Sequence, residues 1–260
     1  MLLLIPNISL GQLPDDLCKG HNTAYEEGEK LVYKVYYNWG IIWVPAGEVA
    51  FTTIETDSQY IFTAIGKSYP SYESVFRVND FYQTKVNKSD LRPKEFVRYI
   101  EEGDYTKFDS LYFNPDANRI HSLNGKNKSK ARWESYPLEA CYLDLLSVMY
   151  RLRNIDINHY RPTESLSLEM FFDKEVYPID VLYEKNEKKK IKDLGKFNTI
   201  KIIPKLIVGN VFKEGDVMEV WVSKDENKIP LLIQSPISVG SIKAVLKSYS
   251  GLKHPLSCKL

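Results

Sequence analysis

Residues 49–65 read VAFTTIETDSQYIFTAI and hold two short apolar runs on either side of a polar stretch. Val49–Ile54 and Tyr60–Ile65 are rich in β-branched and aromatic residues, which favour strands. Glu55–Gln59 between them supplies polar turn residues. The pattern therefore predicts a β-hairpin.

The alternation of apolar and polar residues that predicts strands continues on both sides of this hairpin. Further strands are expected in Glu29–Tyr37, Asp80–Val86, Lys94–Glu101, Tyr105–Phe113, Leu166–Phe172, Val176–Tyr183, Phe197–Ile203, Val217–Val222, Pro230–Gln234 and Ile242–Tyr249. Short, closely spaced strands separated by Gly, Asn, Asp and Pro are typical of antiparallel folds. We therefore predict a mostly β protein with antiparallel, strongly curved sheets, either barrel-like or sandwich-like.

One segment has a helical period instead. In Ser135–Arg153, apolar residues recur every three or four positions, Pro137 occupies the first turn and two arginines lie near the end. This predicts one amphipathic helix near residues 137–153, packed on a sheet face or at the end of a barrel. Asn118–Arg132 is polar and basic, and we expect it to be a loop. We expect residues 12–260 to form a single β-rich domain, with a soft division into two halves near 124–132.

Composition excludes several classes of function. The 35 basic and 34 acidic residues give a net charge of +1, which offers no electrostatic reason to bind nucleic acid. The sequence has no phosphate-binding P-loop, no GxGxxG, no GxSxG, no HExxH and no EF-hand loop. The four histidines stand apart from one another. We therefore expect no cofactor, no metal site and no assigned catalytic residue.

The N-terminus points to export. Leu2–Ile5 are apolar, and Ser9-Leu10-Gly11 places small residues before Gln12, as at the end of a secretory signal peptide. We expect residues 1–11 to be the remnant of such a signal, with its basic region encoded further upstream. An ordinary apolar tail is the alternative. No segment is apolar for long enough to span a membrane as a helix. The expected location is the periplasm or another exported compartment.

The three cysteines, Cys18, Cys141 and Cys258, are too far apart in sequence to suggest a zinc motif. An oxidising compartment allows one disulfide. Cys18 with Cys258 would join the two ends of the chain, and three unpaired thiols are the alternative. Cys141 is expected on the helix, in the core.

Several stretches together resemble the domain of unknown function 3108 family. They are Gly28–Tyr33, the Trp39-Gly40 turn, Pro45–Glu48, Asp144–Arg153, Val220–Ser223, Asp225, Ile229-Pro230 and Val239–Leu246. The resemblance covers about residues 25–252. It implies an exported, mostly antiparallel β protein of the Gram-negative envelope, and it implies no known activity.

The excess of aromatic residues, 13% of the chain, suggests a ligand site. Aromatic-lined concavities are common small-molecule sites, so we expect an apolar or amphiphilic ligand, or a protein partner, in the hollow of the curved sheet. The residues we predict for this site, taken from the Trp-rich turn and the strands after it, are Trp39, Trp43, Tyr69, Tyr72 and Phe76, with Arg77, Asp80 and Arg98 as polar anchors.

Two other functions remain open. One is a carbohydrate-active hydrolase that uses two facing carboxylates, with Glu48, Glu101, Asp104 and Asp109 as candidates. The other is a scaffold in an envelope complex, which would require an exposed edge strand or apolar patch. The sequence favours a protein that is not an enzyme.

Overall fold

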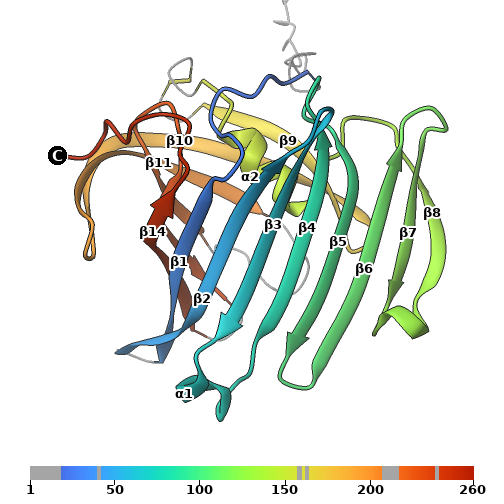
Figure 1. Ribbon diagram of the computed structural model, residues 1–260, viewed down its shortest axis with the longest axis horizontal. Helices are drawn as coiled ribbons and strands as arrows, with labels where there is room; N and C mark the ends of the chain where they lie inside the picture. Colours follow the sequence, from blue (N-terminus) through green and yellow to red (C-terminus); the bar gives the residue numbers. More distant parts are fainter. Residues whose placement is uncertain (1–18, 40–41, 157–159, 162–163, 207–216, 238–239) are drawn as a thin grey trace, which may run out of the picture.

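The computed structural model describes residues 19–39, 42–156, 160–161, 164–206, 217–237 and 240–260. In this part of the chain, fourteen strands form one antiparallel sheet in the order β8-β7-β6-β5-β4-β3-β2-β1-β14-β13-β12-β11-β10-β9. The sheet is strongly curved and remains open between β8 and β9 (Figure 1). The predicted mostly β, antiparallel, curved architecture is confirmed.

The first half of the sheet is a meander in which each strand pairs with the next. Its strands are β1 (Lys30–Trp39), β2 (Ile42–Glu55), β3 (Gln59–Ser68), β4 (Asn79–Asn87), β5 (Pro93–Glu102), β6 (Tyr105–Asn114), β7 (Arg119–Gly125) and β8 (Arg132–Pro137). A short helix, α1 (Pro70–Glu73), lies between β3 and β4, and a 3-10 turn, η2 (Lys128–Lys130), lies between β7 and β8.

The second half is also a meander. Its strands are β9 (Ser165–Phe172), β10 (Glu175–Ile191), β11 (Gly195–Leu206), β12 (Glu219–Ser223), β13 (Pro230–Pro236) and β14 (Ser241–Ser250). The two halves join where β14 pairs with β1. Helix α2 (Leu145–Leu152) connects the halves in sequence and lies within the curve of the sheet (Figure 1).

Two local predictions were wrong. The expected loop at 118–132 contains strand β7, whose alternating Ile120 and Ser122 are buried. Only Ile120 of these two is apolar, so the alternation was weak in the sequence. The helix begins at Leu145 instead of near residue 137, because Asp144 caps it and residues 132–137 pair with β7 as strand β8.

The cysteines also differ from the expectation. Cys258 is a buried free thiol, so it does not form the bridge with Cys18 that was considered above. Cys18 itself lies outside the described residues. Cys141 is disulfide-bonded and precedes α2, so it is neither an unpaired thiol nor a helix residue.

Helix α2 is held against the inner face of the sheet by polar contacts at its two ends. At its start, the hydroxyl of Thr84 on β4 donates to Asp144 Oδ2 at 2.6 Å. At its end, Arg153 forms an ion pair with Glu29, just before β1. Because these contacts fix both ends of the helix, they also define the space between α2 and the strands of the second half.

Candidate functional site

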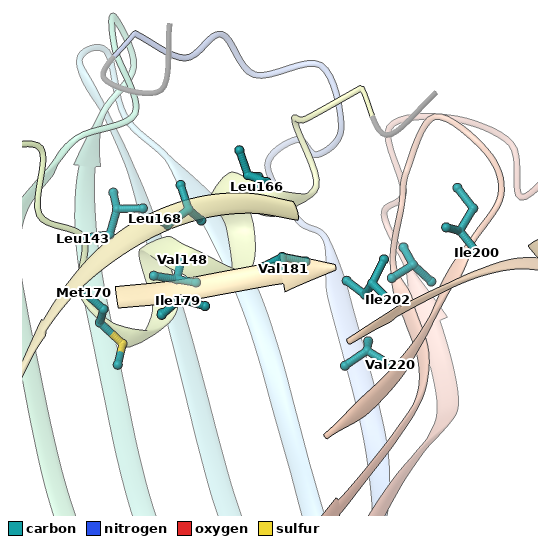
Figure 2. Packing of buried hydrophobic residues seen from close by; sticks show 11 residues of the cluster. Leu143, Val148, Leu166, Leu168, Met170, Ile179, Val181, Ile200, Ile202 and Val220 are labelled. Atoms are coloured by element: carbon teal, nitrogen blue, oxygen red, sulfur yellow. The ribbon is translucent and has the colours of Figure 1, made fainter. Parts of the chain in front are cut away.

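An apolar cavity of about 250 Å³ lies between α2 and the inner face of the second half of the sheet. Its lining comes from the helix, the residues after it and β9–β13. The lining residues are Leu145, Val148, Met149, Leu152, Arg153, Ile155, Tyr160, Leu166, Met170, Ile179, Val181, Tyr183, Ile202, Pro204, Met218, Val220, Val222, Lys228, Pro230 and Ile233. Figure 2 shows the buried aliphatic side chains of this region gathered beside the helix.

The strands supply this apolar wall through their two-residue period. Ile179, Val181 and Tyr183 on β10 alternate with side chains that point to the other face, and Val220 and Val222 do the same on β12. Side chains at positions i and i+2 of a strand share a face. Each strand therefore contributes two or three side chains to the same wall.

The helix forms the opposite wall of the cavity, with side chains that recur every three or four residues. Leu145, Val148, Met149 and Leu152 are spaced by three or four residues and lie on one face. The Asp144 carboxylate accepts from the backbone N–H groups of Leu146 and Ser147, and the Ser147 hydroxyl accepts from Asp144 N–H. This capping box fixes where the helix starts, and hence which of its side chains face the cavity.

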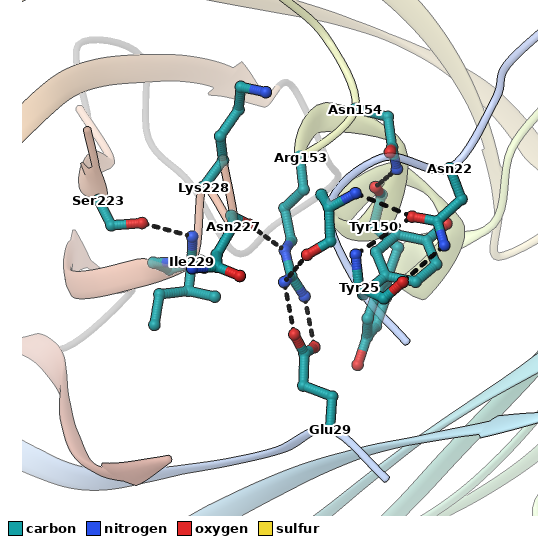
Figure 3. A network of polar contacts seen from close by, with 12 residues as sticks. Asn22, Tyr25, Glu29, Tyr150, Arg153, Asn154, Ser223, Asn227, Lys228 and Ile229 are labelled. Atoms are coloured by element: carbon teal, nitrogen blue, oxygen red, sulfur yellow. Dashed lines mark hydrogen bonds and ion pairs between the residues drawn. The ribbon is translucent and has the colours of Figure 1, made fainter. Parts of the chain in front are cut away.

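Two cationic side chains lie among the apolar ones. Arg153 is fully engaged: its guanidinium contacts both Glu29 oxygens and donates to the carbonyls of Asn227 and Ala24 (Figure 3). Lys228 follows Asn227 in the turn between β12 and β13, and its side chain points away from this network (Figure 3). Burial lowers the pKa of its amine, although Asp156 opposes that shift. Lys228 is therefore a half-buried amine at the boundary of an apolar cavity.

The family follows from comparison with known proteins. The family model "Protein of unknown function (DUF3108)" matches residues 32–247. The chain belongs to the DUF3108 family. A comparison of this DUF3108 protein with curated proteins finds no match.

One solved structure shares the fold of this DUF3108 protein. It is similar to a β-barrel-like protein with a domain of unknown function, DUF1849, from Brucella abortus, with a TM-score of 0.60 and 10% identity. That match covers 89% of this chain and 100% of the other. A protein with a YmcC-like fold from Bacteroides fragilis matches with a TM-score of 0.35 and 12% identity, over 89% of this chain and 99% of the other.

The seven residues of the predicted site whose side chains the structure describes do not all come together in this DUF3108 protein. Trp43 and Tyr69 lie on the outer face of the sheet. Lys243 Nζ is 4.2 Å from the centre of a Trp43 ring, and Lys34 Nζ is 5.8 Å from that of Tyr69. Lys34 neighbours the buried Tyr33 on β1, so the two point to opposite faces. The side chain of Trp39 is outside the described part of the structure.

Tyr72, Phe76 and Arg77 lie in the connection between β3 and β4, away from the cavity. Phe76 and Arg77 are exposed. The Phe76 ring lies next to Gly103 in the turn between β5 and β6, and Gly103 N–H donates to the carbonyl of Arg77. These residues therefore lie at one end of the sheet and not on its concave face.

Asp80 and Arg98 do lie on the inner face, on β4 and β5. Arg98 is buried between Asp109 and Asp173, with its guanidinium 4.2 Å from the centre of the Phe172 ring. Burial, followed by the nearby Glu102 carboxylate, raises the pKa of Asp80, although a hydrogen bond from Glu101 N–H opposes the shift. The pair forms a polar patch on the first half of the sheet, separate from the apolar cavity.

The carboxylates proposed for a hydrolase are engaged elsewhere. Glu48 accepts from Tyr69 and pairs with Lys247 on the outer face, and Asp109 pairs with Arg98 on the inner face. Glu101 accepts from Asn79, and Asp104 lies in an exposed turn. Glu48 and Asp109 are thus on opposite faces of the sheet, which argues against their acting as a facing pair.

The sequence predicted the elements that line the cavity but not the cavity between them. The β9–β13 strands and the α2 period were all predicted, and nothing in their spacing distinguishes a wall from packed core. Lys228 was not singled out. Its signal in the sequence is a lysine placed between two strands and next to the apolar Ile229.

Proposed function

We propose that this DUF3108 protein is an exported protein of the cell envelope that binds an apolar or amphiphilic small molecule in the cavity under α2. The observation that carries the proposal is the apolar cavity of about 250 Å³ with the Lys228 amine at its boundary. Ligand pockets are mostly apolar with a few placed polar groups. The lining of this cavity has that composition.

The size of the cavity restricts the ligand. A dry cavity of ~150 Å³ already accepts a molecule the size of benzene, whereas drug-sized ligands occupy ~300–1,000 Å³. The space under α2 therefore suits one short acyl chain or a small ring system. The ammonium of Lys228 favours an acidic head group, because an anion offsets the cost of burying the amine.

The disulfide at Cys141 supports an exported location, since disulfides persist in oxidising compartments. The apolar N-terminal residues support the same location. No helix in the described residues is both long and apolar enough to cross a bilayer. The disulfide and the apolar N-terminal residues agree with a protein that is exported from the cytoplasm.

Isothermal titration calorimetry with octanoic acid, a fatty acid whose short chain suits the cavity, tests the proposal. Val181→Phe should fill the cavity and weaken binding about tenfold or more, because a methyl-lined space is replaced by a ring. Val176→Phe is the matched control: Val176 lies on the same strand, is exposed, and is not among the cavity residues. Equal affinity in the two variants, or no binding by the wild type, would refute the proposal.

The role of Lys228 is tested separately with two ligands. Lys228→Gln should weaken binding of the acid several-fold and leave the affinity for the corresponding fatty alcohol unchanged, because only the acid carries a charge. Lys224→Gln, at an exposed lysine of the same turn, is the control. Native mass spectrometry of gently purified protein should also detect a bound mass that Val181→Phe lacks.

A further inference from the structure

The meander places alternate connections at the same end of the sheet. The start of β2 and the connections after β3, β5 and β7 lie along the lower edge in Figure 1, and the connections after β2, β4 and β6 lie along the upper edge. We call the lower set the hairpin rim and define it by Ile42, residues 70–77, residues 103–105 and residues 126–133. In the described part of the chain, this edge is built by three separate connections and the start of β2.

The hairpin rim carries large apolar side chains in the open. Val75 (59% exposed) and Phe76 (44%) lie in the connection between β3 and β4, and Ile42 (62%), Tyr105 (55%) and Trp133 (68%) are the first or second residues of β2, β6 and β8. Scattered exposed apolar residues are ordinary, but their concentration at one edge marks an interaction site.

The opposite edge of the same strands has a different composition. Its connections, residues 55–59, 87–93 and 114–119, expose Thr56, Asp57, Ser58, Ser89 and Asp116. The one large aliphatic residue within them, Leu91, is only 3% exposed. Near the strand ends at this edge, Ile54 is 50% exposed and Tyr112 40%, so the opposite edge carries two such side chains among the described residues, compared with five at the hairpin rim.

Positive charge accompanies the apolar residues at the β7–β8 end of the hairpin rim. Lys126, Lys128, Lys130 and Arg132 are all exposed, and they directly precede Trp133. Residues 119–133 contain no acidic residue. The turn is ordered by Asn127, whose side chain accepts from Lys130 N–H. Glu73 and Asp104 are exposed elsewhere on the rim, so the positive field is concentrated beside η2.

We propose that the hairpin rim docks on the surface of a bilayer that contains anionic phospholipid. Aromatic rings with an apolar body and a polar edge favour the membrane interface, and lysines next to it attract anionic head groups. The rim combines both features along one edge that can meet a flat surface. This inference does not depend on the ligand in the cavity.

Co-sedimentation with vesicles tests the inference. Wild-type protein should sediment with vesicles made of equal parts phosphatidylcholine and phosphatidylglycerol, and much less with phosphatidylcholine alone. Binding should fall as NaCl is raised, because salt screens exposed charges. Lys128→Glu with Lys130→Glu should weaken binding about tenfold or more, since each basic residue near an anionic surface contributes substantially.

Matched variants separate the rim from general effects. Lys188→Glu with Lys190→Glu makes the same charge change at exposed positions of β10 and should bind nearly as the wild type does. Trp133→Ser should weaken binding, whereas Tyr112→Ser, at an exposed ring near the other end of β6, should not. The cavity variant Val181→Phe should sediment with the vesicles as the wild type does. A failure of the ligand proposal can therefore be distinguished from a failure of the membrane proposal.

Two outcomes would overturn the inference. One is wild-type protein that does not sediment with the anionic vesicles, which would leave the rim as a protein contact. The other is an equal loss of binding in the η2 and β10 charge variants, which would mean that net charge and not the rim controls sedimentation.

Discussion

Arg153 and Glu29, 124 positions apart in the sequence, form a buried ion pair with two hydrogen bonds, Nη1 to Oε1 at 2.6 Å and Nη2 to Oε2 at 2.7 Å (Figure 3). The pair joins the end of α2 to the start of β1. The guanidinium also donates to two backbone carbonyls, so its burial leaves few donors without an acceptor. This contact holds the helix over the cavity.

Glu29→Gln should therefore destabilise the protein strongly. It leaves the buried Arg153 charge without its counter-ion, which costs about 3–5 kcal/mol in comparable cases. Urea unfolding measures the loss, and Glu27→Gln, at an exposed neighbour, should change stability by less than about 0.5 kcal/mol. If Glu29→Gln is as stable as the control, the pair does not anchor α2.

Asp144 should make stability depend on pH. Burial raises the pKa of its carboxyl from an ordinary value of 3.8 to about 6, although hydrogen bonds from Thr84 and the helix N–H groups oppose the shift. The folded state therefore binds the proton more tightly than the unfolded state. The contribution of this group is fully present below pH 3.8 and is lost as pH rises through about 6.

Asp144→Asn removes this titration and retains a good capping residue. Urea unfolding at several pH values should show the wild type losing up to about 3 kcal/mol relative to Asp144→Asn between pH 4 and pH 7. A constant difference between the two proteins over that range would contradict the expectation.

Asp173 should connect the β9 end of the open sheet to strands β5 and β6 of the first half. It lies in the turn between β9 and β10 and pairs with Arg98 on β5 and Lys107 on β6. Asp173→Asn should cost about 1–3 kcal/mol, because the buried Arg98 is left with Asp109 alone. Asparagine tolerates the positive φ of 46° at this position, so backbone strain is not added.

The control for this variant is Asp116→Asn in the exposed turn after β6. Hydrogen exchange should increase in β9 and β10 of Asp173→Asn, with smaller changes in β1–β4, because only the edge contact is removed. Uniform loss of protection across the sheet would argue against a local role.

Cys258 should be unreactive in the folded protein. Burial, followed by the nearby Asp225, raises the pKa of its thiol to about 12, and only the thiolate is nucleophilic. A thiol reagent such as DTNB should label Cys258 slowly in native protein and completely after unfolding in urea. The Cys258→Ser variant supplies the baseline, and fast labelling of native wild type relative to it would show that the site is open.

The sequence predicted where each strand of the second half lies, because Val220 and Val222 or Ile179 and Val181 alternate with residues of the other face. It ended β10 at Tyr183, whereas the strand continues to Ile191 through mostly charged residues that lack an apolar alternation. It missed β7, since Ser122 is buried there without being apolar. It also started the helix too early. Pro137 and Asp144 are both acceptable at a helix start, and only the pairing of residues 132–137 with β7 decides between them.

The candidate site was less predictable than the fold. Trp43 and Tyr69 were expected in the hollow, and they lie on the outer face beside Lys243 and Lys34. The pairing of β1 with β2 has a β-bulge between Val35 and Tyr36. Beyond such a shift, the residues of the partner strand point to the face opposite to the one that strict alternation would give. The face of a single ring is therefore not determined by counting residues along a strand.

What the sequence determined by itself is local: the strand periods, the single amphipathic helix, the near-neutral charge and the absence of common catalytic motifs. The strand and helix periods follow from interactions between residues close in the chain. The charge and the motifs are read directly from the residues. Only the tertiary structure decided that β14 pairs with β1 and that Arg153 forms an ion pair with Glu29. It also decided that a cavity lies between α2 and strands β9–β13. The physical reason is that each of these depends on packing between residues far apart in sequence, where volume and register, and not local pattern, set the outcome.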